Sequence, residues 1–330
     1  MSAPEYLVAG IGNAIVDVLS HEDDRFLIAH GIEKGAMTLV DDAQAARLYD
    51  ALGPTIQVSG GSAANTIAGI ASLGGKAAFI GKVRNDQLGQ AFSHDIRALG
   101  VHFATPPADR GPATARCLIV VTPDAQRSMS TYLGAAQGLG PDDVDADIVA
   151  GAAITYLEGY LWDPPAAKEA FLKAARLAHD AGRKVSLTLS DAFCVDRYRE
   201  EFRALVRDEV DILFANEAEI LSLYQVATFD EALQAVRGEA AIAALTRSEA
   251  GSVIVDGGEV HVVDAQKPPA LVDTTGAGDQ FAAGFLFGIA TGRSPADAGR
   301  IGSICAAEVI SHMGPRPESP LRDLVAAKGL

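Results

Sequence analysis

Short β-rich runs alternate with helix-length segments along most of the chain, and this alternation constrains the fold more than any other feature. The expected buried strands cover residues 6–12, 55–61, 77–83, 153–160, 184–190, 211–216 and 241–246. Between them lie helical segments such as 62–73, for which Ser62 is the expected N-cap. Two β runs around Asp256, Gly257 and Gly258 indicate a hairpin. The pattern predicts an α/β fold with a largely parallel sheet and helices on both faces.

Two segments fit this core poorly. One covers residues 15 to about 40, and the other covers about 110–136 and alternates like an antiparallel strand pair with its turn at 122–124. We expect them to form a discontinuous small β lid over one edge of the main sheet, within a single domain of 330 residues. The proline-rich stretch 315–320 is expected to be a connector or tail.

Charge and composition exclude several functions. The formal net charge of −16 disfavours nucleic acid as a partner, because a phosphate backbone needs clustered Lys and Arg. The N-terminal apolar stretch is interrupted by glycines, Asn13 and Asp17, and no run is long enough for a membrane span. The three cysteines lie far apart, so neither a zinc site nor a disulfide is indicated. We expect a cytoplasmic protein.

Several familiar motifs are incomplete. The segment 10–15, GIGNAI, lacks the third glycine of a dinucleotide fingerprint, and 69–76, GIASLGGK, places its lysine one residue too late for a P-loop. No GxSxG or HExxH sequence occurs, so these residues give no support to hydrolase or zinc-protease chemistry.

The segment 273–279, DTTGAGD, offers a different chemistry. A turn at Gly276, Ala277 and Gly278 precedes an apolar helix that Asp279 opens. Backbone N–H groups at a helix N-terminus favour anions, glycines allow a phosphate to approach, and an adjacent acid can accept a proton from a hydroxyl. Taken alone, the segment is equally well explained as an ordinary turn followed by a helix with an N-terminal acid.

The segments 59–74 (SGGSAANTIAGIASLG), 81–89 (GKVRNDQLG) and 273–285 (DTTGAGDQFAAGF) together resemble the ribokinase-like (PfkB) family of carbohydrate and nucleoside kinases. The resemblance covers essentially the whole chain. It implies a three-layer α/β/α sandwich with a mostly parallel central sheet and a small β lid. It also implies ATP as donor, Mg²⁺ as cofactor with a monovalent cation such as K⁺ as a further candidate, and a hydroxymethyl group as acceptor.

The resemblance assigns catalytic and cofactor roles position by position. Asp279 matches the catalytic base, and Gly276, Ala277 and Gly278 match the anion hole. The segment 216–219, NEAE, resembles the family's NxxE motif, which links Asn216 and Glu219 indirectly to Mg²⁺, although a capped helix start explains it locally. The remaining nucleotide-side positions are Thr246, Arg247, Gly251 and Thr275, together with Gly278. Ser248 departs from the family's pattern, because it occupies the position of a glycine.

Four further stretches are similar to the family members that phosphorylate adenosine, namely 12–18, 124–136, 156–162 and 189–219. The first contains Asp17, which suits two vicinal ribose hydroxyls because a carboxylate accepts from both. The other acceptor-side positions are Asn13, Gly60, Gly61, Ser62 and Asn65 for the ribose, Tyr160 and Phe193 for the base, and Arg127 of the lid for the phosphates. Ordinary packing is nearly as good an explanation for the two aromatic residues.

The expected partners are therefore small molecules, adenosine and ATP, and the expected assembly is a monomer or homodimer. Two alternatives stay open. One is a kinase of the same family acting on ribose, fructose or another nucleoside, and the other is a non-catalytic nucleoside sensor.

Overall fold

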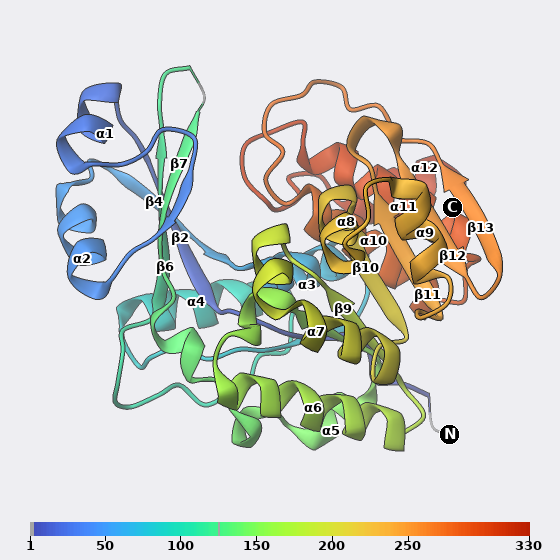
Figure 1. Cartoon of the computed structure of the whole chain (residues 1–330). Helices are drawn as coiled ribbons and strands as arrows, with labels where there is room; N and C mark the ends of the chain where they lie inside the picture. Colours follow the sequence, from blue (N-terminus) through green and yellow to red (C-terminus); the bar gives the residue numbers. More distant parts are fainter. Residues whose placement is uncertain (1–2, 125) are drawn as a thin grey trace.

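The computed structural model describes residues 3–124 and 126–330, and its largest element is a mixed sheet (Figure 1). In spatial order its strands are β13 (Glu259–Val263), β12 (Ser252–Asp256), β11 (Ile242–Thr246), β10 (Ile212–Asn216), β9 (Lys184–Thr188), β8 (Ala152–Glu158), β1 (Tyr6–Ile11) and β5 (Ala77–Ile80). Pairing is parallel from β11 to β5, and the β12–β13 hairpin adds an antiparallel edge. The predicted parallel sheet and the predicted hairpin are both confirmed.

Helices cover both faces of this sheet because successive strand residues point to opposite sides. In β10, Leu213 and Ala215 join one apolar core, and Ile212 and Phe214 join the other. The first core packs under α5 (Ala146–Gly151), α6 (Pro165–Asp180), α7 (Ala192–Asp208), α8 (Glu217–Tyr224) and α9 (Phe229–Val236). The second core packs under α3 (Ser62–Ser72), α4 (Gln87–Ala98), α10 (Ala277–Ala290) and α11 (Pro295–Val309), and α12 (Leu321–Ala327) packs behind α11. The predicted three-layer α/β/α sandwich is therefore confirmed.

A second, smaller sheet stands beside the main one (Figure 1). Its order is β3 (Met37–Leu39), β7 (Arg127–Tyr132), β6 (Ala115–Val121), β2 (Ile15–His21) and β4 (Thr55–Gly60), with α1 (Asp24–His30) and α2 (Asp42–Ala51) against it. The predicted antiparallel pair of strands is β6 with β7. The placement of β4 in the main sheet was wrong, since β4 pairs antiparallel with β2 along its whole length.

Four short 3₁₀ helices lie within the described residues: η1 (Gly134–Gly138), η2 (Pro141–Asp143), η3 (Gly159–Trp162) and η4 (Ser248–Ala250). Among these same residues, no helix combines the length and the apolar character needed to cross a membrane.

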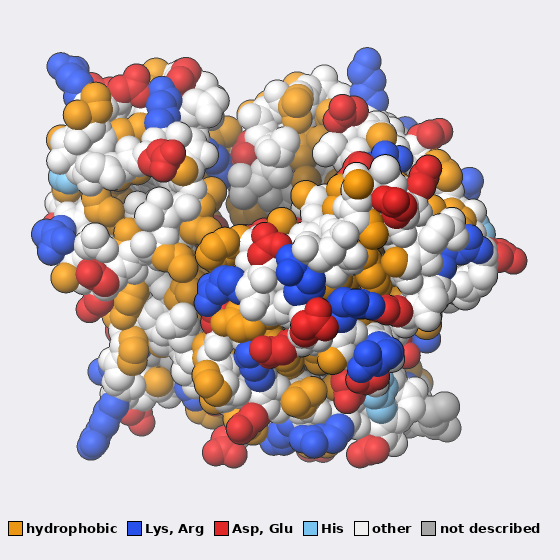
Figure 2. All heavy atoms as spheres, viewed as in Figure 1, with side chains coloured by type: hydrophobic (Ala, Val, Ile, Leu, Met, Phe, Trp, Pro, Cys, Tyr) orange, Lys and Arg blue, Asp and Glu red, His pale blue; other side chains and the backbone are white. Residues whose placement is uncertain are grey.

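The polar residues predicted for the site follow the strands of the main sheet at one edge. Asn13 comes just after β1, Tyr160 just after β8, and Asn216 and Thr246 end β10 and β11. Because these strands are parallel, their carboxyl ends meet at the same edge, which is where ligands bind in open α/β sheets. The space-filling view shows a hollow between the small sheet and the side of the molecule that carries α8 and α10 (Figure 2).

Candidate active site

Asp279 lies in the first turn of α10 and is held by two side chains of α3. Its Oδ1 accepts a hydrogen bond from the Ser62 hydroxyl at 2.6 Å, and its Oδ2 accepts one from Asn65 Nδ2 at 3.1 Å. Burial raises the pKa of Asp279 to about 6, although both hydrogen bonds and the charge of Arg316 lower it. An exposed helix-capping acid would not need partners from another helix, so the geometry argues against an ordinary capped helix start.

The helix N-terminus beside Asp279 carries no side-chain cap. The N-cap residue is Gly276, at φ +78°, and no cap side chain among the described residues bonds to the first turn, although the Ala277 N–H donates to the Thr274 carbonyl at 3.2 Å. A Cβ built at Gly278 meets no atom within 4 Å, whereas one built at Gly276 comes within 2.6 Å of Pro315 Cα. The backbone is therefore open above Gly278, and the uncapped donors there suit an anionic group.

Ser62 is not the N-cap that the sequence predicted. The N-cap of α3 is Gly61, at φ +100°, where an added Cβ would collide with the Asn13 carbonyl oxygen. At Gly60 an added Cβ would meet the Asp17 carboxylate, so the turn also passes close to that side chain. The close passage of this turn leaves the Ser62 hydroxyl free to reach Asp279.

Asp17 lies in β2 of the small sheet and is almost fully buried, at 9% exposure. Burial raises its pKa to about 7, against the charges of Arg316 and Arg127, which lower it. The acid in an apolar strand thus has two cationic neighbours, as a buried carboxyl requires. It is also close enough to Asp279 for that charge to raise its pKa further.

Asn13 does not face the site freely. Its Nδ2 donates to Glu158 Oε1 at 2.7 Å, and Glu158 Oε2 accepts from the Ala63 N–H at 2.8 Å. Glu158 is buried, which raises its pKa to about 7 against three hydrogen bonds that lower it. The residue ties the turn after β1 to the start of α3. Sequence reasoning missed it, although an acid at the end of an apolar strand was a visible signal.

Arg127, at the start of β7, reaches across to the segment before α10. Its Nη1 lies 2.8 Å from Asp273 Oδ2 and 3.3 Å from the Thr275 hydroxyl, and the side chains of the ion pair are each 8% exposed. Burial raises the pKa of Asp273, but N–H donation from Gly314, hydrogen bonds from Thr275 and the charge of Arg127 outweigh it and lower that pKa overall. The predicted site residues Arg127 and Thr275 are therefore in contact.

The two aromatic residues predicted for the base are not core residues. Tyr160 in η3 is 37% exposed and Phe193 in the first turn of α7 is 64% exposed. They lie near each other, because the Tyr160 N–H donates to the Ser190 hydroxyl, three residues before Phe193. Burial raises the pKa of the Tyr160 hydroxyl, and the charge of Asp191, the N-cap of α7, raises it further. The Arg197 guanidinium stands 5.4 Å from the Phe193 ring centroid. Exposed rings at a ligand-binding edge are not explained by packing.

Three of the residues predicted for the nucleotide side lie at the end of β11 and in the compact turn that follows it: Thr246, Arg247 and Gly251. The Arg247 N–H donates to the Gly251 carbonyl at 2.8 Å, and Ser248 adopts φ +50°, the left-handed region in which glycine is unstrained. The turn thus forms despite the substitution of Ser248 for glycine. The Arg247 guanidinium bonds to Glu217 at 3.0 Å and stacks 4.1 Å from the Phe229 ring centroid.

Asn216 and Glu219 bond to each other in a capping box at the start of α8. Burial raises the pKa of Glu219 to about 7. In the part of the chain that the structure describes, no three His, Cys, Asp or Glu side chains gather as a metal cage. A magnesium ion fits this site as a companion of bound phosphates, as Mg²⁺ usually binds, with at most one or two carboxylates.

Arg316 is a second residue of the candidate site that the sequence did not reveal. Its Nε lies 3.3 Å from Asn65 Oδ1 and its Nη1 lies 3.4 Å from Asp95 Oδ2. The stretch 315–320 is therefore not a mere connector or tail. Only a lone arginine between Pro315 and Pro317 marks it in the sequence, and that signal is too weak to have identified it.

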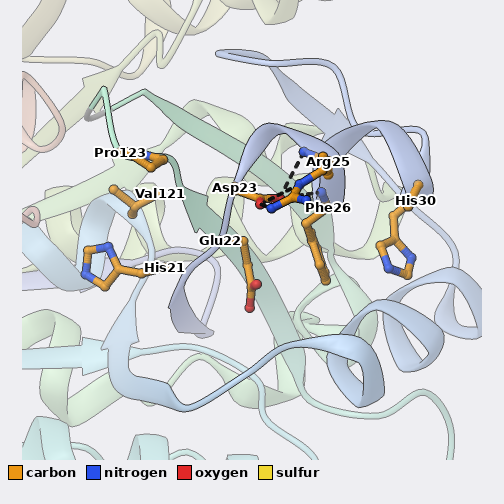
Figure 3. A pocket seen from close by; sticks show the side chains of 9 residues that line it. His21, Glu22, Asp23, Arg25, Phe26, His30, Val121 and Pro123 are labelled. Carbon is orange, nitrogen blue, oxygen red and sulfur yellow. Dashed lines mark hydrogen bonds and ion pairs between the residues drawn. The ribbon is translucent and has the colours of Figure 1, made fainter.

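Two cavities lie elsewhere and contain none of the predicted site residues. One, of about 640 Å³, sits at the tip of the small sheet, where Asp23 already pairs with Arg25 at 2.8 Å (Figure 3). The other, of about 590 Å³, is lined by Arg84, His94 and Arg97 on and near α4. Neither holds the buried carboxyls described above.

Known proteins with similar sequences and structures share this architecture. A solved structure described as a probable sugar kinase protein from Rhizobium etli is 54% identical, with 99% of each chain covered and a TM-score of 0.92. The adenosine kinase from Sinorhizobium meliloti is 53% identical, with 99% of this chain and 100% of that chain covered and a TM-score of 0.91. An ATP-dependent ribose-1-phosphate kinase from Halopiger xanaduensis is 30% identical over 82% of this chain and 86% of its own length.

The model of the pfkB family carbohydrate kinases matches residues 52–322. This range includes the Gly60–Gly61 turn, the buried Asp279 and Arg316. Members of this family are kinases, which use ATP and typically Mg²⁺. The chain belongs to the pfkB carbohydrate kinase family and is a phosphotransferase with an alcohol group as acceptor.

Proposed function

We propose that the protein phosphorylates the 5′-hydroxyl of adenosine, converting ATP and adenosine to ADP and AMP in purine salvage. The observation that carries the proposal is the buried Asp279 carboxylate, fixed by Ser62 and Asn65 beside the uncapped N-terminus of α10. A base and an anion cradle are adjacent there, as phosphoryl transfer to an alcohol requires.

Asp279 acts as the general base. With a pKa of about 6 it is mostly ionised at neutral pH and still basic enough to take a proton. The 5′-hydroxyl gives its proton to Asp279 as its oxygen attacks the γ-phosphorus in line, and the bond from that phosphorus to the β–γ bridging oxygen breaks to release ADP.

The amides of Gly276, Ala277 and Gly278 stabilise the charge on the transferring phosphoryl group. They are preorganised at a helix N-terminus, so they cost little rearrangement during the reaction. Mg²⁺, when bound with ATP, supplies further neutralisation of phosphate charge. Thr246, Arg247, Gly251 and Thr275 line the nucleotide side, and Asn216 with Glu219 acts on Mg²⁺ indirectly.

Adenosine is the proposed acceptor because of the residues on the opposite side. Asp17 accepts hydrogen bonds from the ribose hydroxyls, assisted by Asn65 and the Gly60–Gly61 turn, with Asn13 fixing the adjacent backbone through Glu158. The exposed rings of Tyr160 and Phe193 flank the purine. The 53% identity to the adenosine kinase from Sinorhizobium meliloti supports this choice.

The small sheet serves as a discontinuous lid of the single domain. Its strand β2 carries Asp17 and its strand β7 carries Arg127, so movement of this sheet alters both ends of the acceptor site. Closure excludes water and limits wasteful hydrolysis of ATP. Arg127 then reaches the phosphates from its position beside Thr275.

A substrate panel with coupled detection of ADP tests the acceptor. It compares adenosine with guanosine, ribose, fructose and ribose 1-phosphate at equal concentrations. We expect kcat/KM for adenosine to exceed the others by at least about 10²-fold, on the scale of sites that read substrate polar groups. Equal or greater turnover of a sugar favours the second candidate, a sugar kinase, which the 54% identity to the Rhizobium etli protein supports.

The cellular setting is part of the proposal. The reaction consumes ATP, and the three buried free cysteines suit a reducing compartment, so we propose a cytoplasmic monomer or homodimer. Gel filtration with light scattering tests the assembly, and assays in K⁺ against Na⁺ test a monovalent-cation requirement. A non-catalytic nucleoside sensor would bind adenosine in calorimetry without any turnover of ATP.

A further inference from the structure

Arg316 lies between Asn65 of α3 and Asp95 of α4. Its guanidinium contacts Asn65 at 3.3 Å and Asp95 at 3.4 Å, and Asn65 in turn donates to Asp279 at 3.1 Å. One side chain thus touches both a partner of Asp279 and an acid of α4. Its third nitrogen, Nη2, is buried and has no hydrogen-bond partner among the described residues.

The backbone around Arg316 is fixed by contacts from three directions. Gly314 donates to Asp273 at 2.9 Å, and Gln280 Nε2 donates to the Pro315 carbonyl at 3.0 Å. Glu308 then accepts from the N–H groups of Glu318 and Ser319 at 3.0 and 2.8 Å. These bonds hold the segment against α10 and α11, so the guanidinium is presented rigidly.

Asp95 extends the reach of Arg316 to the glycine turn. Besides Arg316, the Asp95 Oδ2 accepts a hydrogen bond from the Ser59 N–H at 2.7 Å and another from the Ser59 hydroxyl. Ser59 directly precedes Gly60 and Gly61, which pass against Asp17 and Asn13. A displacement of the Arg316 guanidinium would therefore shift the Ser59–Gly61 turn as well as Asn65.

We infer that Arg316 is a positioning residue for phosphoryl transfer, which fixes Asn65, the Ser59–Gly61 turn and, through Asn65, the Asp279 carboxylate. The inference rests on the proposed role of Asp279 as the base. Its free Nη2 leaves one donor for the bound acceptor.

Several charged and titratable groups interact with Asp279, either through their charges or through hydrogen bonds. They are Asp17 from β2, Tyr156 and Glu158 from β8, and Arg316, with the neutral donors Ser62 and Asn65 from α3. The charge of Arg316 lowers the pKa of both Asp279 and Asp17, and the charge of Arg127 in β7 also lowers the pKa of Asp17. Removal of the Arg316 charge takes this cation away from Asp279 and Asp17, which raises the pKa values of both acids.

The test compares Arg316→Gln, Arg316→Lys and the control Arg322→Gln, an exposed arginine that pairs with its neighbour Asp323. For each variant, thermal unfolding is recorded, and kcat and KM are measured from pH 5 to 9 with the acceptor that gives the greatest turnover. In Arg316→Gln we expect the acidic limb of kcat/KM to move up by about one pH unit. The loss from ionisation alone is then about twofold at pH 7 and approaches tenfold below pH 6.

Arg316→Lys separates charge from geometry. We expect it to keep the acidic limb near that of the wild type and to raise the KM of the acceptor, because one ammonium group cannot span Asn65 and Asp95 as a guanidinium does. A folded Arg316→Gln protein with an unshifted limb overturns the inference. If Arg316→Gln does not fold, an unchanged acceptor KM in Arg316→Lys overturns it instead.

The failure of this inference is distinguishable from failure of the proposed function. Full turnover by Asp279→Asn would refute the role of Asp279 as the base, whatever the Arg316 variants show. An inactive Asp279→Asn protein together with an unshifted acidic limb in Arg316→Gln would refute only the role of Arg316.

Discussion

The Ser62 hydroxyl donates to the Asp279 carboxylate at 2.6 Å, although 217 residues separate the two in the chain. The bond joins the start of α3 to the start of α10 and fixes the Asp279 carboxylate between the two helices. Because Ser62 bonds to Asp279, it does not cap its own helix, and Gly61 takes that position. The relationship explains why two glycine-bounded helix starts belong to one site.

Replacing Asp279 by asparagine should abolish most of the turnover without loss of the fold. The amide keeps the volume and can still bond to Ser62 and Asn65, but it cannot take a proton. We expect kcat to fall roughly 10²–10⁴-fold, measured by coupled release of ADP. Asp323→Asn, at an exposed position of α12, is the matched control and should retain full activity. Full turnover by a folded Asp279→Asn protein would falsify the assignment of the base.

Activity should fall on the acidic side of neutrality. Asp279 and Asp17 both act as carboxylates, and burial raises their pKa values to about 6 and about 7. A raised pKa keeps these groups protonated up to a higher pH, so the acidic limb of kcat/KM should lie between about pH 6 and 7. The measurement is the pH profile of the free enzyme's kcat/KM. A limb below pH 5 would show that neither buried acid controls the reaction.

Alanine at two glycines of the proposed anion cradle should affect different properties, activity at Gly278 and stability at Gly276. Gly278 lies in the helix with open space around its missing Cβ, so Gly278→Ala should leave thermal stability intact while the methyl group displaces the phosphate, lowering kcat/KM roughly 10²-fold. Gly276 has φ +78° and lies against Pro315, so Gly276→Ala should lower the free energy of unfolding by about 1–3 kcal/mol. Stability and activity lost together in both variants would contradict the open cradle.

Which features the sequence could predict depended on how local their causes are. The strands, the β12–β13 hairpin and the helix starting at the DTTGAGD turn follow from short-range patterns and were predicted correctly. The sheet that a strand joins depends on distant pairing, and β4 was placed wrongly because its partner β2 lies far upstream.

Arg316 illustrates the same limit within the site. Its partners Asn65 and Asp95 are 251 and 221 residues away, and its neighbours Pro315 and Pro317 are typical of a connector. Nothing in the local sequence indicates that a turn after α11 returns to α3. The glycine at Gly278 could be predicted because the physical requirement, room for an anion at a helix N-terminus, is contained in a few adjacent residues.

Glu219 should make stability depend on pH. Burial raises its pKa in the folded protein from 4.5 to about 7, so the folded state holds this proton more tightly than the unfolded chain. The resulting stabilisation is fully present below the unfolded pKa and is lost as pH rises through about 7. Relative to the wild type, Glu219→Gln should therefore gain stability between pH 5 and 7 in urea unfolding. A stability difference that stays constant over this range would contradict the raised pKa.

Phe193 should bind the acceptor's base without supporting the fold. Its ring is 64% exposed, so Phe193→Ala removes little buried area and should leave thermal unfolding nearly unchanged. Loss of one stacked base costs about 1–3 kcal/mol, so the KM for adenosine should rise roughly 5- to 150-fold. The KM for ATP should stay the same, because the ring lies on the acceptor side, and Phe193→Trp should restore binding.

Ile28→Ala provides the matched control for this experiment, since Ile28 is 80% exposed and lies on α1, away from the predicted base site. It should change neither KM. If Phe193→Ala leaves the KM for adenosine unchanged while the protein still phosphorylates adenosine, the purine is not stacked on this ring. If the variant loses adenosine turnover but keeps turnover of a sugar, the ring selects the nucleoside and the phosphoryl-transfer machinery around Asp279 is independent of it.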